Sequence, residues 1–425
     1  MLEVTEGWHD FGGLKWELVL CLLLAWIIVA ASLIKGVQSS GKVVYFTALF
    51  PYLVLVILCI QGATLPGASE GIKFYLTPKW ELLAAPKVWA EAATQIFYSL
   101  GPAFGGLITL SSYNKFKNNC VRDAIVIAFS NCLTSVFAGF AIFSIVGYMA
   151  HELGVPTSQV IKSGPGLAFI AYPDAIAQMP LSPVWAVLFF VMLITLGLDS
   201  QFTMVETLIT ALLDEMPHLR SRKSSVVIGI CAVMFVLGLS MCARGGIYMF
   251  TLIDSYSAGW SLLILALLEI VAVHYVYGST RFMANIKEMV GEWMYPSRYY
   301  WLINWCFLAP GLITSILFFS WIMYEPASYG GEPFPLWVNV IGWAMAFSPL
   351  IIFLVMGANQ YKQAIRKNLG WRSLFRPSAS WGPAYVRENL PSQKAKTDNE
   401  ISANSGYDNP VFSENPSEYV TSTHL

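Results

Sequence analysis

The sequence contains few charged residues. Only 12% of its 425 residues are Asp, Glu, Lys or Arg, and 56% are hydrophobic, whereas a soluble domain carries about 25% charged residues. A chain this poor in charge cannot cover a water-facing surface, so its apolar excess must face lipid. The formal net charge is -1 and no basic stripe is present, which excludes a nucleic-acid-binding protein.

The sequence also lacks the side-chain groupings of enzymes and metal sites. The five histidines are scattered, and no nucleophile–base–acid set or phosphate-binding loop is present. The seven cysteines do not have metal-ligand spacing, and we interpret them as small buried hydrophobic residues. These absences argue against an enzyme.

Long apolar stretches are abundant. A membrane-spanning helix needs about 20 mostly apolar residues, and about nine stretches qualify: 16–34, 43–60, 92–110, 125–150, 184–213, 225–242, 249–277, 300–323 and 336–356. None has the alternating pattern of a membrane β-strand, so helices are the only reasonable choice. The sequence therefore predicts an all-α membrane protein, a polytopic helical bundle whose fifth and seventh stretches are tilted or extended.

Basic residues alternate between successive connections. Lys and Arg near span ends stay cytoplasmic, and they gather in 35–42, 115–122, 220–223, 281–298 and beyond 361, whereas 156–183 has one and 324–335 has none. This alternation predicts a cytoplasmic C-terminus and an outer N-terminus. Because residues 1–14 have no signal-peptide pattern, we expect an odd number of spans upstream of this sequence. The alternative is that no span is missing and that the first span alone directs the N-terminus to the outer side of the membrane.

The third stretch is interrupted at its centre. Pro102 removes a backbone donor and clashes with the preceding turn, and three neighbouring glycines lower the helix propensity further. Transporters use such breaks because the freed carbonyl groups bind a cation. The adjacent Gln95 and Ser99 favour a binding site over the alternative, a simple proline kink.

A carboxylate lies deep in the fifth stretch. Asp199 in an apolar span costs about 2.5 to 3.5 kcal/mol, which demands a cation, a partner or water. Leu196 and Ser200 lie beside it on the helix, and this oxygen set suits Na⁺ better than a calcium cage. A buried structural aspartate is the alternative.

Other polar residues lie in or near spans. Asn131 and Ser135 are one turn apart and share a face that could hold ions. Asp254 lies near the outer end of its span, where a gate could use it. Glu206 and Glu269 are equally compatible with a structural and a functional role.

Four segments together resemble the neurotransmitter:sodium symporters. Segment 95–101, followed by segment 111–116, resembles the family's unwound sixth helix. Segment 163–169 resembles its fourth outer loop, and segment 196–202 resembles its eighth helix. The family fold has twelve spans built from an inverted repeat. The resemblance therefore implies this fold lacking its first three helices. It divides the chain into an outer-loop remnant (1–13), a transmembrane transporter domain (14–359) and a disordered cytoplasmic tail (360–425).

The resemblance also implies ion sites. The first sodium would be bound by Ser99 and Asn131, and the second by the Leu196 carbonyl with Asp199 and Ser200. Chloride would be held by Gln95, Ser99 and Ser135. Chloride-independent relatives have Glu at the Ser135 position, so we expect Na⁺ and Cl⁻ to be co-transported ions.

The same resemblance implies a substrate pocket and two gates. The pocket would be formed by Tyr98, Gly101, Phe104 and Met204, and the gates by Asp254 outside and by Tyr113 and Asp214 inside. The N-terminal Arg that usually partners Asp214 is absent from this sequence. The bulky Met204 favours a small amino acid, with GABA, betaine or taurine as alternatives.

The expected function is sodium- and chloride-coupled symport of a small amino acid or related neurotransmitter across the plasma membrane. Because half of each ion site would be missing, we expect little or no uptake by this chain alone. The alternative is an inactive truncated isoform or incomplete gene product that acts, if at all, through partners. The C-terminal Thr423-His424-Leu425 fits the edge of a PDZ-type domain.

Overall fold

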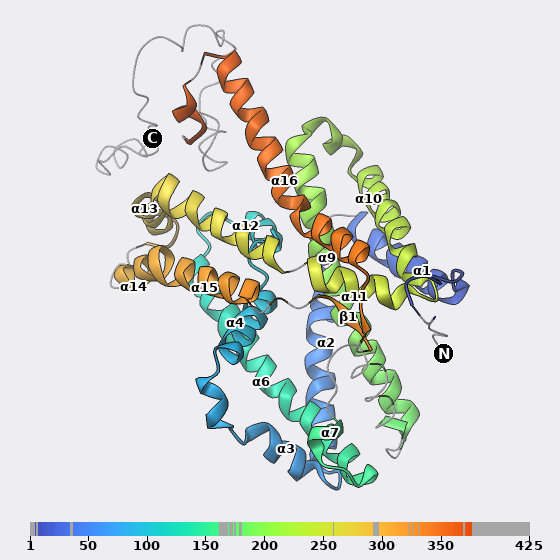
Figure 1. Ribbon diagram of the computed structural model, residues 1–425. Helices are drawn as coiled ribbons and strands as arrows, with labels where there is room; N and C mark the ends of the chain where they lie inside the picture. The colour runs from blue at the N-terminus through green and yellow to red at the C-terminus, as the bar shows by residue number, and fades with distance from the viewer. Residues whose placement is uncertain are drawn as a thin grey trace.

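A computed structural model gives the fold of the chain (Figure 1). It describes residues 5, 7–34, 37–160, 181–257, 259–291, 297–322, 324, 326–330, 332–368 and 370–375, together with 169, 173, 176 and 177. The predicted outer-loop motif at 163–169, apart from residue 169, and the C-terminal Thr423–Leu425 motif lie outside these residues.

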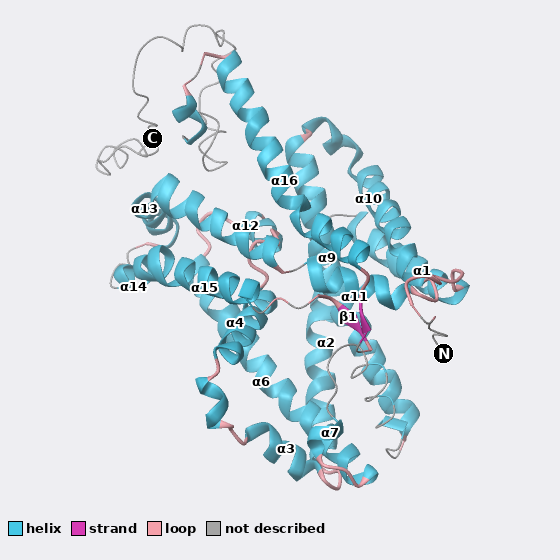
Figure 2. Ribbon diagram, viewed as in Figure 1, coloured by secondary structure: helices cyan, strands magenta, loops and turns pink. Residues whose placement is uncertain are grey.

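Almost every described element is a helix, which confirms the predicted fold class (Figure 2). Eight stretches of the described chain are long and apolar enough to cross a membrane. They are formed by α1 (Trp16–Ile34), α2 (Val37–Ala63), α6 (Cys120–Leu153), α9 (Ser182–Glu215), α10 (Lys223–Gly238) with its 3-10 extension Leu239–Cys242, the stretch Gly246–Val290, the stretch Arg298–Ile322, and α16 (Leu336–Arg366).

The stretch predicted at 92–110 is divided into two helices, α4 (Pro86–Leu100) and α5 (Gly106–Ser112). The other short elements are α3 (Ala68–Leu76), α7 (Thr157–Val160), the 3-10 helices Trp80–Ala84, Pro217–Arg222 and Trp371–Phe375, and the antiparallel pair β1 (Ser328–Tyr329) and β2 (Glu332–Pro333).

Helix α9 lies at the centre of the packing that positions the site. On one side it packs with α2 and α6 around Val54, Ile145 and Phe189. On the other side it packs with α1 and α10 around Ile209 and Val227. Close van der Waals packing of this kind holds membrane helices together, because lipid offers no hydrophobic drive between them.

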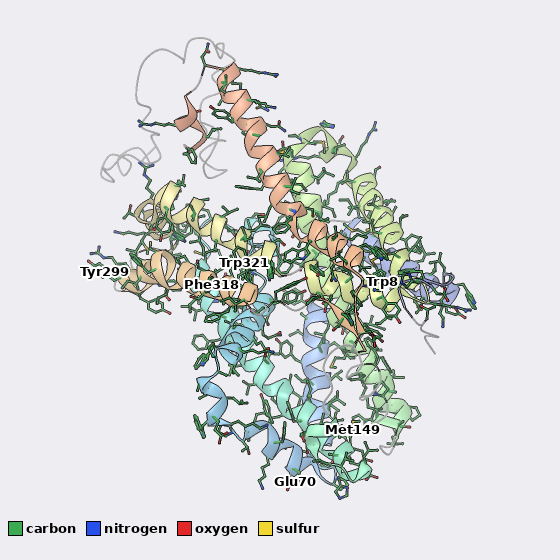
Figure 3. The ribbon with its side chains drawn as sticks, viewed as in Figure 1. Trp8, Glu70, Met149, Tyr299, Phe318 and Trp321 are labelled. Atoms are coloured by element: carbon green, nitrogen blue, oxygen red, sulfur yellow. The ribbon has the colours of Figure 1, made fainter. Side chains whose placement is uncertain are left out.

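The segment before α1 is joined to the connection between α10 and α11 (Gly246–Ser257). Leu14 forms an antiparallel bridge with Ala243, and the Gly245 amide donates a hydrogen bond of 3.0 Å to the Phe11 carbonyl. Trp8, labelled in Figure 3, packs its ring against Tyr248 at a centroid distance of 6.0 Å. Residues 7–14 are therefore anchored against a part of the chain that is remote in sequence.

Two predicted boundaries were wrong. The span expected at 249–277 is divided: α11 ends at Ser257, and α12 (Trp260–Ile270) begins after Gly259, which lowers helix propensity. From Ile270 the chain continues through a π-helix, Val271–Gly278, into α13 (Ser279–Val290). The tail expected from 360 also begins too early, because α16 continues to Arg366 and buries Ala364.

Candidate ion and substrate site

The break between α4 and α5 shows how the backbone leaves the helix. Gly101 ends α4 in the left-handed region with a φ of 65°, and Gly105 precedes α5 with a φ of 79°. Ala103 between them also has a positive φ, 61°, a conformation that strains a residue with a side chain. Five residues at the centre of a predicted span are therefore unwound, and the interruption predicted from the sequence is confirmed.

Ser99 is the second-last residue of α4 and contacts α6. Its hydroxyl donates a hydrogen bond of 2.8 Å to the Asn131 amide oxygen. The Asn131 amide nitrogen is buried, and no described residue accepts a hydrogen bond from it. Two of the residues proposed for the first sodium thus place their oxygens side by side beside the unwound segment.

The residues proposed for chloride lie on the same two helices. Gln95 is one turn before Ser99 on α4, and Ser135 is one turn after Asn131 on α6. The Ser135 hydroxyl donates to the Asn131 backbone carbonyl at 3.0 Å, so it is bonded within its own helix. The structure places the three residues on facing elements but does not join Gln95 to either serine by a hydrogen bond.

The second proposed sodium set lies on α9. The Ser200 hydroxyl donates to the Leu196 carbonyl at 3.3 Å, and the Thr47 hydroxyl of α2 donates to an Asp199 carboxylate oxygen at 3.2 Å. Thr47 is only 3% exposed. Sequence reasoning missed this partner, whose one signal was a hydroxyl in the middle of an apolar span.

Two residues of the proposed substrate pocket contact each other across the break. The rings of Tyr98 and Phe104 meet edge to face at a centroid distance of 5.7 Å. The segment then approaches α9 closely, because a side-chain carbon added at Gly106 would lie 2.9 Å from the Thr203 methyl group. Met204 follows Thr203 on α9 and is half exposed.

The C-terminal end of α5 is connected to α9 and α10. The Tyr113 hydroxyl donates to Glu206 at 2.9 Å, and Lys223 forms an ion pair with the same carboxylate oxygen at 3.1 Å. Glu206 is 4% exposed, so this is a buried ion pair. Burial, the largest cause, raises the pKa of the Tyr113 phenol further above neutral pH.

Of the other two proposed gate residues, Asp214 lies close enough to Tyr113 to contribute electrostatically, after burial, to the raised pKa of that phenol, whereas Asp254 lies on another helix. Asp214 pairs with Arg220 at 3.0 Å, and both side chains are well exposed, at 68% and 61%. The sequence had indicated only the loss of an N-terminal partner for Asp214, and Arg220 was not predicted as a replacement. Asp254 is exposed on α11, away from Tyr113 on α5.

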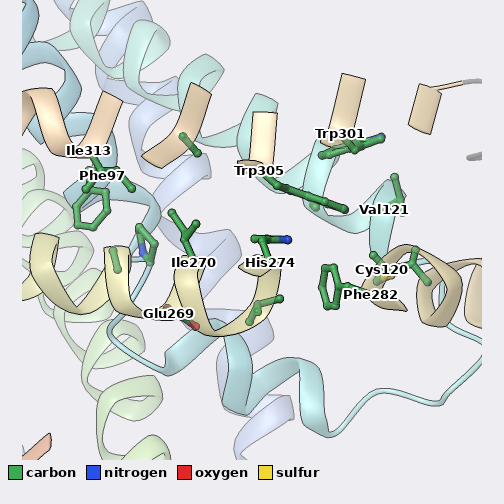
Figure 4. A pocket seen from close by; sticks show the side chains of 16 residues that line it. Phe97, Cys120, Val121, Glu269, Ile270, His274, Phe282, Trp301, Trp305 and Ile313 are labelled. Carbon is green, nitrogen blue, oxygen red and sulfur yellow. The ribbon is translucent and has the colours of Figure 1, made fainter. Parts of the chain in front are cut away.

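A cavity of about 500 Å³ opens beside the break (Figure 4). Phe97 and Pro102 line it from the α4–α5 side, and Glu269 and His274 line it from α12 and its π-helical continuation. Most of the remaining lining side chains are apolar. Glu269 therefore places a carboxylate beside the unwound segment, but no described contact assigns it a function.

Comparison with known proteins decides the family. The sequence profile of the sodium:neurotransmitter symporter family matches residues 1–364. The chain belongs to this family. It is therefore a multi-pass membrane protein of a transporter family and not an enzyme, as predicted.

Three relatives indicate the branch of the symporter family. The chain is 50% identical to the sodium- and chloride-dependent glycine transporter 2 of Xenopus laevis over 357 residues, which are 84% of the chain and 45% of the relative. It is 47% identical to the human sodium- and chloride-dependent neutral and basic amino acid transporter B(0+) over 421 residues, 96% of the chain and 65% of the relative. The Xenopus laevis glycine transporter 1 is 45% identical over 391 residues, 90% of the chain and 61% of the relative. The symporter chain thus spans about half to two thirds of these relatives.

Proposed function

We propose that the chain is part of a sodium- and chloride-coupled symporter for glycine or another small neutral amino acid. The observation that carries the proposal is the Ser99–Asn131 contact, which joins the end of α4, directly before the unwound segment, to α6 through two oxygen atoms. In transporters, a monovalent cation such as Na⁺ is coordinated by freed backbone carbonyls and neutral side-chain oxygens. The names of the relatives support both ions and the amino-acid substrate.

The residues proposed for the second sodium add a carboxylate. Asp199 is half-buried in α9 and accepts a hydrogen bond from Thr47 of α2. Sodium bound there would offset the charge that the carboxylate carries into the membrane. The proposed ligands all lie on α9, and the Thr47 hydrogen bond links the same carboxylate to α2.

The proposed substrate is small because of the side chains around the break. Tyr98 and Phe104 contact each other across the unwound segment, and the long Met204 side chain follows Thr203 on α9, the helix that Gly106 approaches closely. We further propose that the symporter lies in the plasma membrane with a cytoplasmic C-terminus, as the alternation of basic residues predicts. A PDZ-type partner at Thr423–Leu425 remains a proposal from the sequence.

Uptake of radioactive glycine tests the function. We would express the 425-residue chain alone, and also joined behind the part of the frog glycine transporter 2 that precedes the matched region. The joined protein is expected to take up glycine only with sodium and chloride outside, and Asp199→Asn should abolish this uptake. Asp10→Asn, which changes an exposed aspartate near the N-terminus, is the matched control.

The second candidate function is a chain that does not transport and acts through partners. Absence of uptake by both proteins, with normal amounts at the cell surface, would favour this candidate. Sodium-dependent uptake that survives Asp199→Asn would instead contradict the proposed ion site.

A further inference from the structure

The Asp199 carboxylate is bonded to a helix other than its own. The Thr47 hydroxyl of α2 donates a hydrogen bond of 3.2 Å to Asp199 Oδ1 on α9, and the two helices pack side by side (Figure 1). Both residues belong to stretches that are apolar enough to cross a membrane. A polar contact between two such stretches is costly to lose, because other partners are scarce in an apolar environment.

Thr47 is the residue that orients this carboxylate within the described part of the chain. No described Lys, Arg or His forms an ion pair with Asp199. Thr195, one turn earlier on α9, directs its hydroxyl to the carbonyls of Val191 and Met192. Thr47 occupies Oδ1, and no described residue donates a hydrogen bond to Oδ2. The second oxygen is therefore left for a cation.

Thr47 is itself held in place. Its side chain is 3% exposed and makes a further interaction besides the bond to Asp199. The branched side chain of threonine also has few rotamers in a helix. Two and three turns further along α2, Val54 and Leu58 are buried in the core that α2 shares with α6 and α9. A residue that positions another must be locked by packing, and Thr47 meets this condition.

We propose that Thr47 is a positioning residue for the second sodium ion. Its hydroxyl stays on Oδ1 and holds the Asp199 carboxylate in one orientation, and Oδ2 binds the ion together with Leu196 and Ser200. Thr47 acts through Asp199 and does not contact the ion. The inference rests on the proposed sodium site and adds a residue of a second helix to it.

Two opposing effects decide how Thr47 changes the sodium affinity. A hydroxyl bonded to the carboxylate competes with a cation for its negative charge. Holding the side chain in advance, however, removes an entropy cost that sodium binding would otherwise carry. The second effect is the larger one here, because the hydroxyl and the ion use different oxygens of Asp199. Removal of the hydroxyl should therefore weaken sodium binding by about fivefold.

The sodium dependence of glycine uptake by the joined protein tests this role. Thr47→Val removes the hydroxyl but keeps the branched shape, so it should raise the half-saturating sodium concentration by about fivefold. The KM for glycine at saturating sodium should not change. Thr47→Ser keeps the hydroxyl and should restore the original sodium dependence. A residue that only supports the fold would lower the maximal rate and the amount at the cell surface, without moving the half-saturating sodium concentration.

The matched control is Thr195→Val. Thr195 is 5% exposed, close to the 3% of Thr47, and its hydroxyl bonds to carbonyls of its own helix. This variant should keep the sodium dependence of the unsubstituted protein. Equal half-saturating sodium concentrations in Thr47→Val and Thr195→Val would overturn the inference.

Binding of radioactive sodium to the same proteins separates this inference from the proposed function. If the unsubstituted joined protein binds sodium but takes up no glycine, the proposed function fails. The positioning role is then decided by whether Thr47→Val binds sodium more weakly than Thr195→Val. In an Asp199→Asn background, Thr47→Val should have no further effect, since no carboxylate is left to orient. An unsubstituted joined protein that binds no sodium contradicts both.

Discussion

The Ser99 hydroxyl and the Asn131 amide oxygen are joined by a hydrogen bond of 2.8 Å across α4 and α6. The bond lies two residues before the left-handed Gly101 at which α4 ends. It therefore fixes the position of the unwound segment relative to α6. A cation that enters between these oxygens must replace this bond with its own coordination.

Ser99→Ala is expected to weaken sodium binding by roughly tenfold or more, because it removes one oxygen and leaves the Asn131 amide without its donor. Equilibrium binding of radioactive sodium to the joined protein, in which the chain follows the N-terminal part of the frog glycine transporter 2, measures this effect. Thr94→Ala on the same helix is the control, since its hydroxyl bonds only to the Ala90 carbonyl one turn earlier. Similar sodium affinities in the two variants would show that Ser99 is no ligand.

Ser135→Glu is expected to make transport independent of chloride. A carboxylate at this position of α6 would supply the negative charge that we propose chloride provides beside the sodium ion. Uptake by the joined protein would be compared in chloride and in gluconate buffer. The control is Ser135→Gln, which adds bulk without charge. Ser144→Glu is unsuitable as a control because Ser144 is fully buried. Chloride dependence retained in the glutamate variant contradicts the assignment.

Lys223→Met is expected to lower the free energy of unfolding by about 3 kcal/mol, because it leaves the buried Glu206 carboxylate without its cation. Arg220→Met provides the comparison, since its pair with Asp214 is exposed and contributes at most about 1 kcal/mol. Denaturant unfolding in detergent measures both. The double variant Lys223→Met, Glu206→Gln should recover most of the loss, and failure to recover would show that Lys223 contributes through packing.

Gly106→Ala is expected to destabilise the protein by about 1 to 3 kcal/mol, because the new methyl group overlaps the Thr203 methyl group of α9. Thr203→Ser removes that methyl group and should relieve the effect when the two changes are combined. Gly229→Ala on α10, where the added carbon meets nothing within 4 Å, should be neutral or stabilising. If Gly106→Ala and Gly229→Ala unfold at the same denaturant concentration, α5 does not pack tightly on α9.

The sequence predicted features that depend on local chemistry. Pro102 with its glycines located the break, and hydrophobic length located the spans, because both effects act within one segment. Periodicity places Asp199 on a face of α9, but it does not reveal which helix packs there, so Thr47 was missed. Lys223 and Arg220 were counted only as topology signals, although one closes a buried ion pair and the other an exposed one. The division after Ser257 was missed because composition on both sides of Gly259 is equally apolar.

The pairing of residues 7–14 with the start of α11 links two parts of the chain that are more than 200 positions apart. α1 begins at Trp16, two residues after Leu14, so a shift of α11 along its axis would pull on the beginning of α1. The two helices then behave as one mechanical unit at that end, with Asp254 on one member of it. If the proposed symport proceeds by alternating access, the proposed outer gate residue would move together with the first helix of the chain.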